Sequence, residues 1–461
     1  MLDVAELGSE HWKIWSLSAM GVFLDGFDLF IIGVALPLIV KDMKPSPGME
    51  GMIGAAAVLG AMIGAFFGGK LTDRFGRKAI YIVDLAFFII FSLLTAFAWN
   101  PLSLVVLRFL LGIGVGADYP ICASYVSEFM PARMRGRMLI GAFSFQALGM
   151  LAAALTGLVI LKFYPHLIAW RWMLGIGAVP ALLVMVLRAT VPESARWYLE
   201  HGHTKKAAKV IALLVPAKKS DIEKIMLKEE EHLEKHKAEQ SYSTLFSAKY
   251  IRRTVLASGA WFLMDIATYA VGIFTPTILA AMAFDITVHG RINRDFKATQ
   301  GAAFLDLFLI VGFLLNVWLV DKWGRINLQI LGFAGMTVGL LALGYAAGLE
   351  AAGTQVTALV FFGFILFNIL MNMGPNATTF ILPAELFSTR VRASGHGFAS
   401  ACAKLGAAIG IFFLPLVRSA FGTANLLYGL AGVTLAGLLI TVFFRVETRG
   451  RSLEEIDPGE V

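Results

Sequence analysis

The stretch GGKLTDRFGRK, residues 68–78, closes one long apolar run at 51–70 and opens onto another at 79–99. Part of it returns as DKWGR at 321–325, again between two apolar runs. A short basic loop between apolar runs of bilayer length is typical of a multi-pass membrane protein. The rest of the chain follows the same arrangement, so this loop indicates the fold of the whole.

The composition agrees with a chain that lies mostly inside a lipid bilayer. Of the 461 residues, 58% are apolar and 15% are charged, whereas soluble domains carry roughly 25% charged residues. The mean hydropathy is +0.74. A soluble enzyme is excluded because one hydrophobic core cannot bury so much apolar surface. An outer-membrane barrel is excluded because its strands alternate apolar and polar residues, whereas these runs are unbroken.

The apolar runs fall into two groups on either side of a charged central segment. A membrane-spanning helix needs ~20 apolar residues, and each run is long enough. We therefore expect an all-α membrane protein with twelve transmembrane helices in two six-helix halves, at 1–191 and 254–461, joined by a cytoplasmic linker at 192–253. The expected spans lie at 14–40, 51–70, 79–99, 102–127, 138–162, 168–190, 254–281, 299–320, 328–348, 355–384, 393–418 and 424–444.

The positions of the basic loops predict the orientation of the chain. The loops at 68–78, 131–137, 321–325 and 388–392 lie on the same side as the linker and both termini. Because Lys and Arg concentrate in cytoplasmic loops, we expect both termini to be cytoplasmic, in the plasma or inner membrane. The same rule explains the net charge of +7, so no nucleic-acid partner is expected. The stretch 222–240 is expected to be an amphipathic helix with a solvated face.

Signals for cofactors, metals and disulfides are weak. Cys122 and Cys402 both lie in apolar runs, so neither a disulfide framework nor a zinc site is expected. Residues 64–70 have the spacing of a phosphate-binding loop, but Leu71 stands where that loop needs Ser or Thr. The N-terminus lacks the basic region and cleavage site of a signal peptide. We expect no cofactor and no metal.

Three motifs recur along the chain. The loop 68–78, the pair Ser127-Glu128 and the segment 192–194 return in the same order at an offset of about 250 residues, as in transporters built from two parallel halves. Each places charges at a cytoplasmic helix end, where ion pairs can break and reform, so we expect a gate there. The alternative is that these charges only fix topology. The expected gating residues are Asp73, Arg77, Glu128, Arg135, Asp321, Arg325, Glu385 and Arg392.

Ionisable residues within the expected spans are functional candidates, because burying a charge in a membrane is costly. Trp261, Asp265 and Tyr269 lie at i, i+4 and i+8, on one helix face. Lys404 lies about three turns from the cytoplasmic end, too deep for its ammonium group to reach water easily. Asp84 and His396 lie near the cytoplasmic side and are expected to be structural, whereas Asp306 could be structural or functional. The remaining candidates are Asp25, Asp28, Arg108 and Asp118.

Together these side chains predict an anion site that is coupled to protons. Lys404 offers a cation, and Tyr119, Gln146, Trp261 and Tyr269 offer neutral hydrogen-bond donors. A protonated carboxyl group can donate a hydrogen bond to an anion, whereas an ionised carboxylate repels it. Aspartates in the site therefore link the binding of a proton to the binding of the anion.

Several motifs resemble those of one large family. The loop 68–78 and the RxxxGxG pattern at 108–114 resemble the major facilitator superfamily. The segments PESARW, at 192–197, and VETRGRSLEEI, at 446–456, resemble its sugar-porter branch and relatives. This resemblance covers nearly the whole chain, and it implies two six-helix halves with a substrate site between them.

Three further stretches are similar to the phosphate:proton symporters of that superfamily. They are GADYP at 116–120, the stripe at 261–269 and the long segment at 374–407, which is the most specific. The resemblance implies proton coupling through Asp25, Asp28, Arg108, Asp118 and Asp265. It also implies that phosphate is bound by Tyr119, Gln146, Trp261, Asp265, Tyr269, Asn376 and Lys404.

The expected function is proton-coupled import of inorganic phosphate by alternating access, with no enzymatic activity. The alternative is a symporter for an organic acid or a sugar, although a sugar site favours neutral Gln and Asn pairs where the run 254–281 has Trp, Asp and Tyr. A nutrient receptor and a multidrug exporter fit less well, because the linker is short and the buried polar groups are numerous. Phosphate, protons and the bilayer are the expected partners of a monomer.

Overall fold

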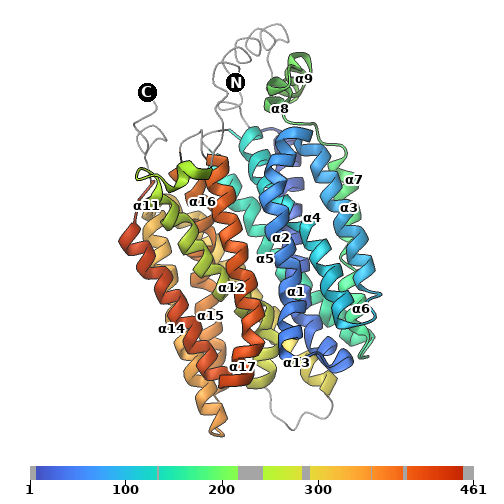
Figure 1. Cartoon of the computed structure of the whole chain (residues 1–461), viewed down its shortest axis with the longest axis vertical. Helices are drawn as coiled ribbons and strands as arrows, with labels where there is room; N and C mark the ends of the chain where they lie inside the picture. The colour runs from blue at the N-terminus through green and yellow to red at the C-terminus, as the bar shows by residue number, and fades with distance from the viewer. Residues whose placement is uncertain are drawn as a thin grey trace.

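A computed structural model of the protein describes residues 7–131, 134–215, 242–282, 291–354, 356–387 and 392–449. Every regular element in those ranges is a helix, and the long helices stand side by side (Figure 1). The all-α membrane fold that the sequence predicts is therefore confirmed. The amphipathic helix expected at 222–240 lies outside the described residues.

The first half consists of long helices that run back and forth across the bundle (Figure 1). Ser46 and Asn100 cap α2 and α4 by accepting a hydrogen bond from a backbone N–H of the first turn. α6 and α7 are two segments of one span, Ala169–Arg188. The helices are α1 (Ser9–Met43), α2 (Pro47–Phe75), α3 (Arg77–Thr95), α4 (Pro101–Phe129), α5 (Arg135–Phe163), α6 (Ala169–Gly175) and α7 (Ala178–Arg188).

Short helices lie between the halves in sequence. α8 (Ala195–Glu200) and α9 (Thr204–Leu214) sit beyond one end of the bundle (Figure 1), and η2 (Tyr242–Phe246) precedes the second half. The second half comprises α11 (Ile251–Thr254), η3 (Val255–Gly259), α12 (Ala260–Met282), α13 (Arg291–Trp323), α14 (Arg325–Ala351), α15 (Thr357–Met373), α16 (Pro375–Leu386) and α17 (Arg392–Phe444).

The number of spans agrees with the sequence once α17 is divided. Eleven stretches of the described chain are long and apolar enough to cross a membrane, and the last, Gly395–Phe444, has 50 residues. Gly422 interrupts it with φ 81° and ψ 168°, which joins two helices across a turn. The expected boundary between the last two spans, at 419–423, coincides with this turn.

Each half carries the same brace at the end of the bundle where α2 ends, which we call the motif end; the opposite end is the far end. In the first half, Glu193 accepts hydrogen bonds from the backbone N–H of Arg77 (3.0 Å) and of Lys78 (2.9 Å). In the second half, Glu447 does the same for Arg325 (3.0 Å) and for Ile326 (3.1 Å). These bonds satisfy the free N–H groups at the starts of α3 and α14.

An ion pair completes each brace. Arg77 pairs with Glu128 at 3.0 Å, and Arg325 pairs with Glu385 at 2.9 Å. Ser194 donates a hydrogen bond to Glu128, and Thr448 donates one to Glu385. The two networks use matching residues in matching order, so the repeat in the sequence corresponds to a repeat in the structure.

The two halves meet along α2 and α17, α5 and α13, and α1 and α12. Towards the far end this contact is backbone against backbone. A Cβ atom added to Gly33 of α1 would lie 2.1 Å from the carbonyl oxygen of Ile273 on α12, and one added to Gly51 of α2 would lie 2.3 Å from that of Phe412 on α17. We call these two contacts the glycine seam. Any side chain at either glycine would force the halves apart.

Candidate functional site

A pocket lies between the two halves, and all seven residues expected to bind phosphate line it. α4 and α5 contribute two of them from the first half, and α12, α16 and α17 contribute five from the second. The sequence does not single out the apolar and neutral part of the lining, since such residues are common in every span. The expected residues are Tyr119, Gln146, Trp261, Asp265, Tyr269, Asn376 and Lys404, and the others are Phe30, Phe143, Met150, Thr268 and Met371.

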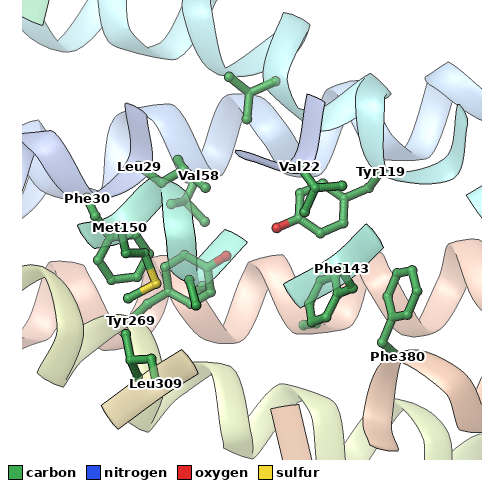
Figure 2. Close-up of a cluster of buried hydrophobic side chains, with 14 of the residues drawn as sticks. Val22, Leu29, Phe30, Val58, Tyr119, Phe143, Met150, Tyr269, Leu309 and Phe380 are labelled. Carbon is green, nitrogen blue, oxygen red and sulfur yellow. The ribbon is translucent and has the colours of Figure 1, made fainter. Parts of the chain in front are cut away.

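The polar groups of the pocket form one network across the two halves. Lys404 donates to the Tyr269 hydroxyl at 2.8 Å, and its ammonium nitrogen lies 4.4 Å from the ring centre of Tyr119. The Gln146 amide donates to the Tyr119 hydroxyl at 2.8 Å and to the Tyr269 hydroxyl at 3.4 Å. In Figure 2 both phenol oxygens face the same space between the helices. The site therefore gathers a cation and three neutral donors.

Asp265 lies beside this network. It is 3% exposed, it is within electrostatic reach of Lys404, and it is hydrogen-bonded to Trp261. In the described part of the chain its Oδ2 atom has no hydrogen-bond partner. Because a buried polar atom without a partner is costly, this oxygen is free to bind a ligand or a proton. The ring of His396 also contacts Trp261, with ring centres 5.8 Å apart.

Towards the motif end, aromatic rings close the pocket. Phe143 of α5 stacks on Phe380 of α16 with ring centres 4.5 Å apart and planes 10° apart, as Figure 2 shows. Nearer to the end of the bundle, Arg137 of α5 pairs with Asp321 of α13 at 2.9 Å. Both contacts join one half to the other, so the motif end is closed by side chains in two layers.

Towards the far end, the pocket is closed by a contact between two aromatic rings and by the glycine seam. The ring of Phe30 on α1 lies 5.7 Å from that of Tyr269 on α12. At the end of the bundle Glu50 of α2 pairs with Arg418 of α17 at 3.7 Å. With both ends closed, the structure has an occluded conformation.

The residues expected to handle protons lie outside the pocket lining, except Asp265. Asp28 of α1 lies 3.6 Å from Arg108 of α4, which also donates to the Asp28 carbonyl oxygen at 3.4 Å. Asp25 lies one turn away, within electrostatic reach of Lys404. All of these side chains are buried. The structure thus brings Asp28 and Arg108 together as a pair next to α1.

Asp118 has a partner that the sequence analysis missed. Arg188, at the end of α7, donates to Asp118 at 2.8 Å and 3.4 Å through its two terminal nitrogens. A basic residue at the end of a span is ordinary by the positive-inside rule, so nothing in the sequence singled it out. Arg188 is buried, at 3% exposed, and this burial follows from the packing of the helices rather than from the local sequence.

Arg77 and Arg325, two of the expected gating residues, form ion pairs with residues of another motif. Arg77 pairs with Glu128, and Arg325 pairs with both Glu385 and Asp321. All these pairs lie within one half, as the braces described above. At the motif end, a described ion pair that crosses between the halves joins the expected gating residue Asp321 to Arg137, which the sequence does not single out. The side chains of Asp73, Arg135 and Arg392 lie outside the described part of the structure.

Comparisons with known proteins agree with this architecture. Residues 15–459 match the family described as sugar (and other) transporter. The chain is 31% identical to the low affinity inorganic phosphate transporter 8 of Medicago truncatula, over all of this chain and 92% of that protein. It is 30% identical to a protein of Escherichia coli (strain K12) named as a metabolite transport protein, YaaU, over 98% of this chain and 96% of that one.

Solved structures show the same fold. A partially occluded, inward-open form of the xylose transporter XylE from E. coli superposes with a TM-score of 0.79 at 20% identity, and covers 96% of this chain and all of that one. At this identity the likeness concerns the fold. Together with the family match over nearly the whole sequence, it shows that the chain belongs to the sugar (and other) transporter family of the major facilitator superfamily.

Proposed function

We propose that this protein imports inorganic phosphate together with protons by alternating access. The observation that carries the proposal is the Lys404 network, which places one buried ammonium, two phenols and an amide around one space between the halves. A small oxyanion needs one cation and several donors that converge on it. The names of relatives that transport inorganic phosphate support the same substrate.

Asp265 gives this site a means of coupling. Ionised, its carboxylate pairs with Lys404 and repels an anion; protonated, it leaves Lys404 free and offers a donor. Binding of phosphate and binding of a proton therefore favour each other. Release of the proton on the cytoplasmic side weakens the site and releases the anion.

The energetics require such coupling. Phosphate carries about one to two negative charges near neutral pH. An inside-negative membrane potential opposes its entry by ~2.3 kcal/mol per charge per 100 mV. Uptake against this potential needs at least one co-transported cation.

Uptake into proteoliposomes tests the proposed function. Radiolabelled phosphate is expected to accumulate when the outside is acidic, with or without sodium, and to be displaced by unlabelled phosphate. Sulfate, a sugar such as xylose, and a carboxylate such as citrate serve as competitors. Efficient displacement by xylose or by citrate, with weak displacement by phosphate, would assign the site to the alternative substrate class.

The contact between Arg137 and Asp321 is proposed to latch the cytoplasmic side, which we place at the motif end. Arg137→Ala is expected to raise the population that is open there by about 1.5- to 5-fold, since exposed ion pairs contribute ~0.2–1 kcal/mol. The measurement is the labelling rate of a cysteine placed at Met371, in a background without Cys122 and Cys402. Lys322→Ala, which removes an exposed charge nearby, is the control. Equal labelling in both variants would contradict a latch.

A further inference from the structure

Apart from the phosphate pocket, the first half encloses a second group of buried charges. Asp84 of α3 is 5% exposed, and it lies within electrostatic reach of Asp118 on α4, Arg188 on α7 and Asp25 on α1. Tyr81, one turn before Asp84, faces the same group: the Arg188 guanidinium lies 3.8 Å from its ring centre. Cys122 of α4 also borders it. From its position in the sequence alone, Asp84 is expected to be structural.

The charges in this half do not balance. Among the described residues of its spans four aspartates are buried, Asp25, Asp28, Asp84 and Asp118. Two buried arginines, Arg108 and Arg188, lie near them, whereas the third, Arg77, pairs with Glu128. Arg108 and Arg188 each have one close aspartate, Asp28 at 3.6 Å and Asp118 at 2.8 Å. In the described chain Asp25 and Asp84 each keep one carboxyl oxygen without a hydrogen-bond partner. A buried carboxylate without a cation is expensive, so such a group holds a proton instead.

Two features connect Asp84 to transport. First, α1 crosses directly over the Asp118–Arg188 pair at Gly21, where an added Cβ would lie 1.7 Å from an Asp118 oxygen and 2.0 Å from an Arg188 nitrogen. Movement of α1 therefore moves this pair. Second, a small pocket lined by Ser18, Lys78, Tyr81, Tyr125 and Arg188 with nearby apolar residues lies between this group and the motif end.

We propose that Asp84 carries a second transported proton. Asp84 gives this proton to Asp118 when the Arg188 guanidinium leaves Asp118 and pairs with Asp84. While Arg188 pairs with Asp118, Asp84 is neutral and holds the proton. When α1 shifts, Arg188 turns towards Asp84, and the proton passes from Asp84 to Asp118, which releases it through the small pocket to the cytoplasm as Arg188 turns back. Asp84 takes up a new proton when Arg188 returns to Asp118. This role rests on the proposed function and adds a carrier outside the phosphate pocket.

The test compares Asp84→Asn with Asp84→Glu in the full chain. The amide of Asp84→Asn has the size and the neutral charge of the protonated Asp84 carboxyl group, so this variant is expected to retain phosphate exchange within about twofold. It loses one proton per cycle, so at a pH difference of one unit and zero membrane potential its accumulation ratio should fall about tenfold. Asp84→Glu should restore it. Asp42→Asn, which removes a carboxyl that accepts a hydrogen bond from Trp170 at 2.9 Å, should behave like the parent.

Infrared spectroscopy gives a readout that does not depend on the substrate. The band of a buried, protonated carboxylic acid is expected in the parent and is expected to weaken in Asp84→Asn. An unchanged band together with an unchanged accumulation ratio would overturn the role of Asp84. If the parent moved no phosphate, the proposed function would fail, and the infrared band would still decide whether Asp84 holds a proton.

Discussion

Lys404→Ala is expected to abolish phosphate counterflow and to weaken phosphate binding by about 30-fold or more. Lys404 is 3% exposed and is the cation of the pocket lining. Loss of one partner from a buried, hydrogen-bonded charge pair costs 2–5 kcal/mol or more, and 2 kcal/mol corresponds to about 30-fold in affinity. Binding to purified protein by isothermal calorimetry measures the affinity directly.

A conservative variant separates charge from shape at this position. Lys404→Arg keeps the cation but replaces a compact ammonium by a planar guanidinium, so we expect it to retain part of the binding and little transport. The Tyr269 hydroxyl, which accepts from Lys404 at 2.8 Å, should tolerate this change better than the loss of the donor. Thermal unfolding of each variant checks that it is folded. Phosphate binding at the parent level in folded Lys404→Ala would remove Lys404 from the site.

Asp265→Asn is expected to abolish phosphate accumulation driven by a pH gradient. An amide cannot release a proton, so the step that weakens the site on the cytoplasmic side is lost. Asp28→Asn is also expected to lose accumulation, but for a different reason: it leaves Arg108 without the carboxylate that lies 3.6 Å from it. Because Asp28 lies outside the pocket lining, its variant should keep downhill phosphate exchange at least partly.

The two assays, gradient-driven uptake and exchange, distinguish these roles. Asp306→Asn is the matched control, since Asp306 lies on α13 and outside the pocket lining, and it should behave like the parent in both. Uptake that ignores the pH gradient but follows sodium would refute proton coupling. Full accumulation in both Asp265→Asn and Asp28→Asn would show that other carboxyl groups carry the protons.

The site residues with polar side chains could be found in the sequence because a bilayer makes them conspicuous. Lys404 and Asp265 stand out in apolar runs, where an unpaired charge is costly. The periodicity of a helix then groups Trp261, Asp265 and Tyr269 on one face. Which of the other helices face them does not follow from periodicity. The resemblance to phosphate:proton symporters supplied Asn376, and the structure places it in the same pocket.

Other parts of the structure leave no such signal in the sequence. Phe143 and Phe380 stack between the halves, but a phenylalanine within a span is ordinary wherever it faces. Arg137 and Arg188 resemble the many basic residues at span ends, and their function depends on partners that lie far away in the sequence. Pairing of this kind is a property of the packed bundle. The break at Gly422 was visible, because a short polar stretch separates two apolar runs.

The two closures of the pocket differ in how mutation can adjust them. At the motif end the halves meet through the Phe143–Phe380 stack and the Arg137–Asp321 pair, so substitutions there can change the strength of the closure in small steps. At the glycine seam even a methyl group meets a backbone carbonyl, so the closure is either complete or prevented. Substitutions at the motif end can therefore change the opening rate gradually. A substitution at either seam glycine prevents closure outright, so among the contacts described on the other side of the membrane only the Phe30–Tyr269 and Glu50–Arg418 contacts can be adjusted in small steps.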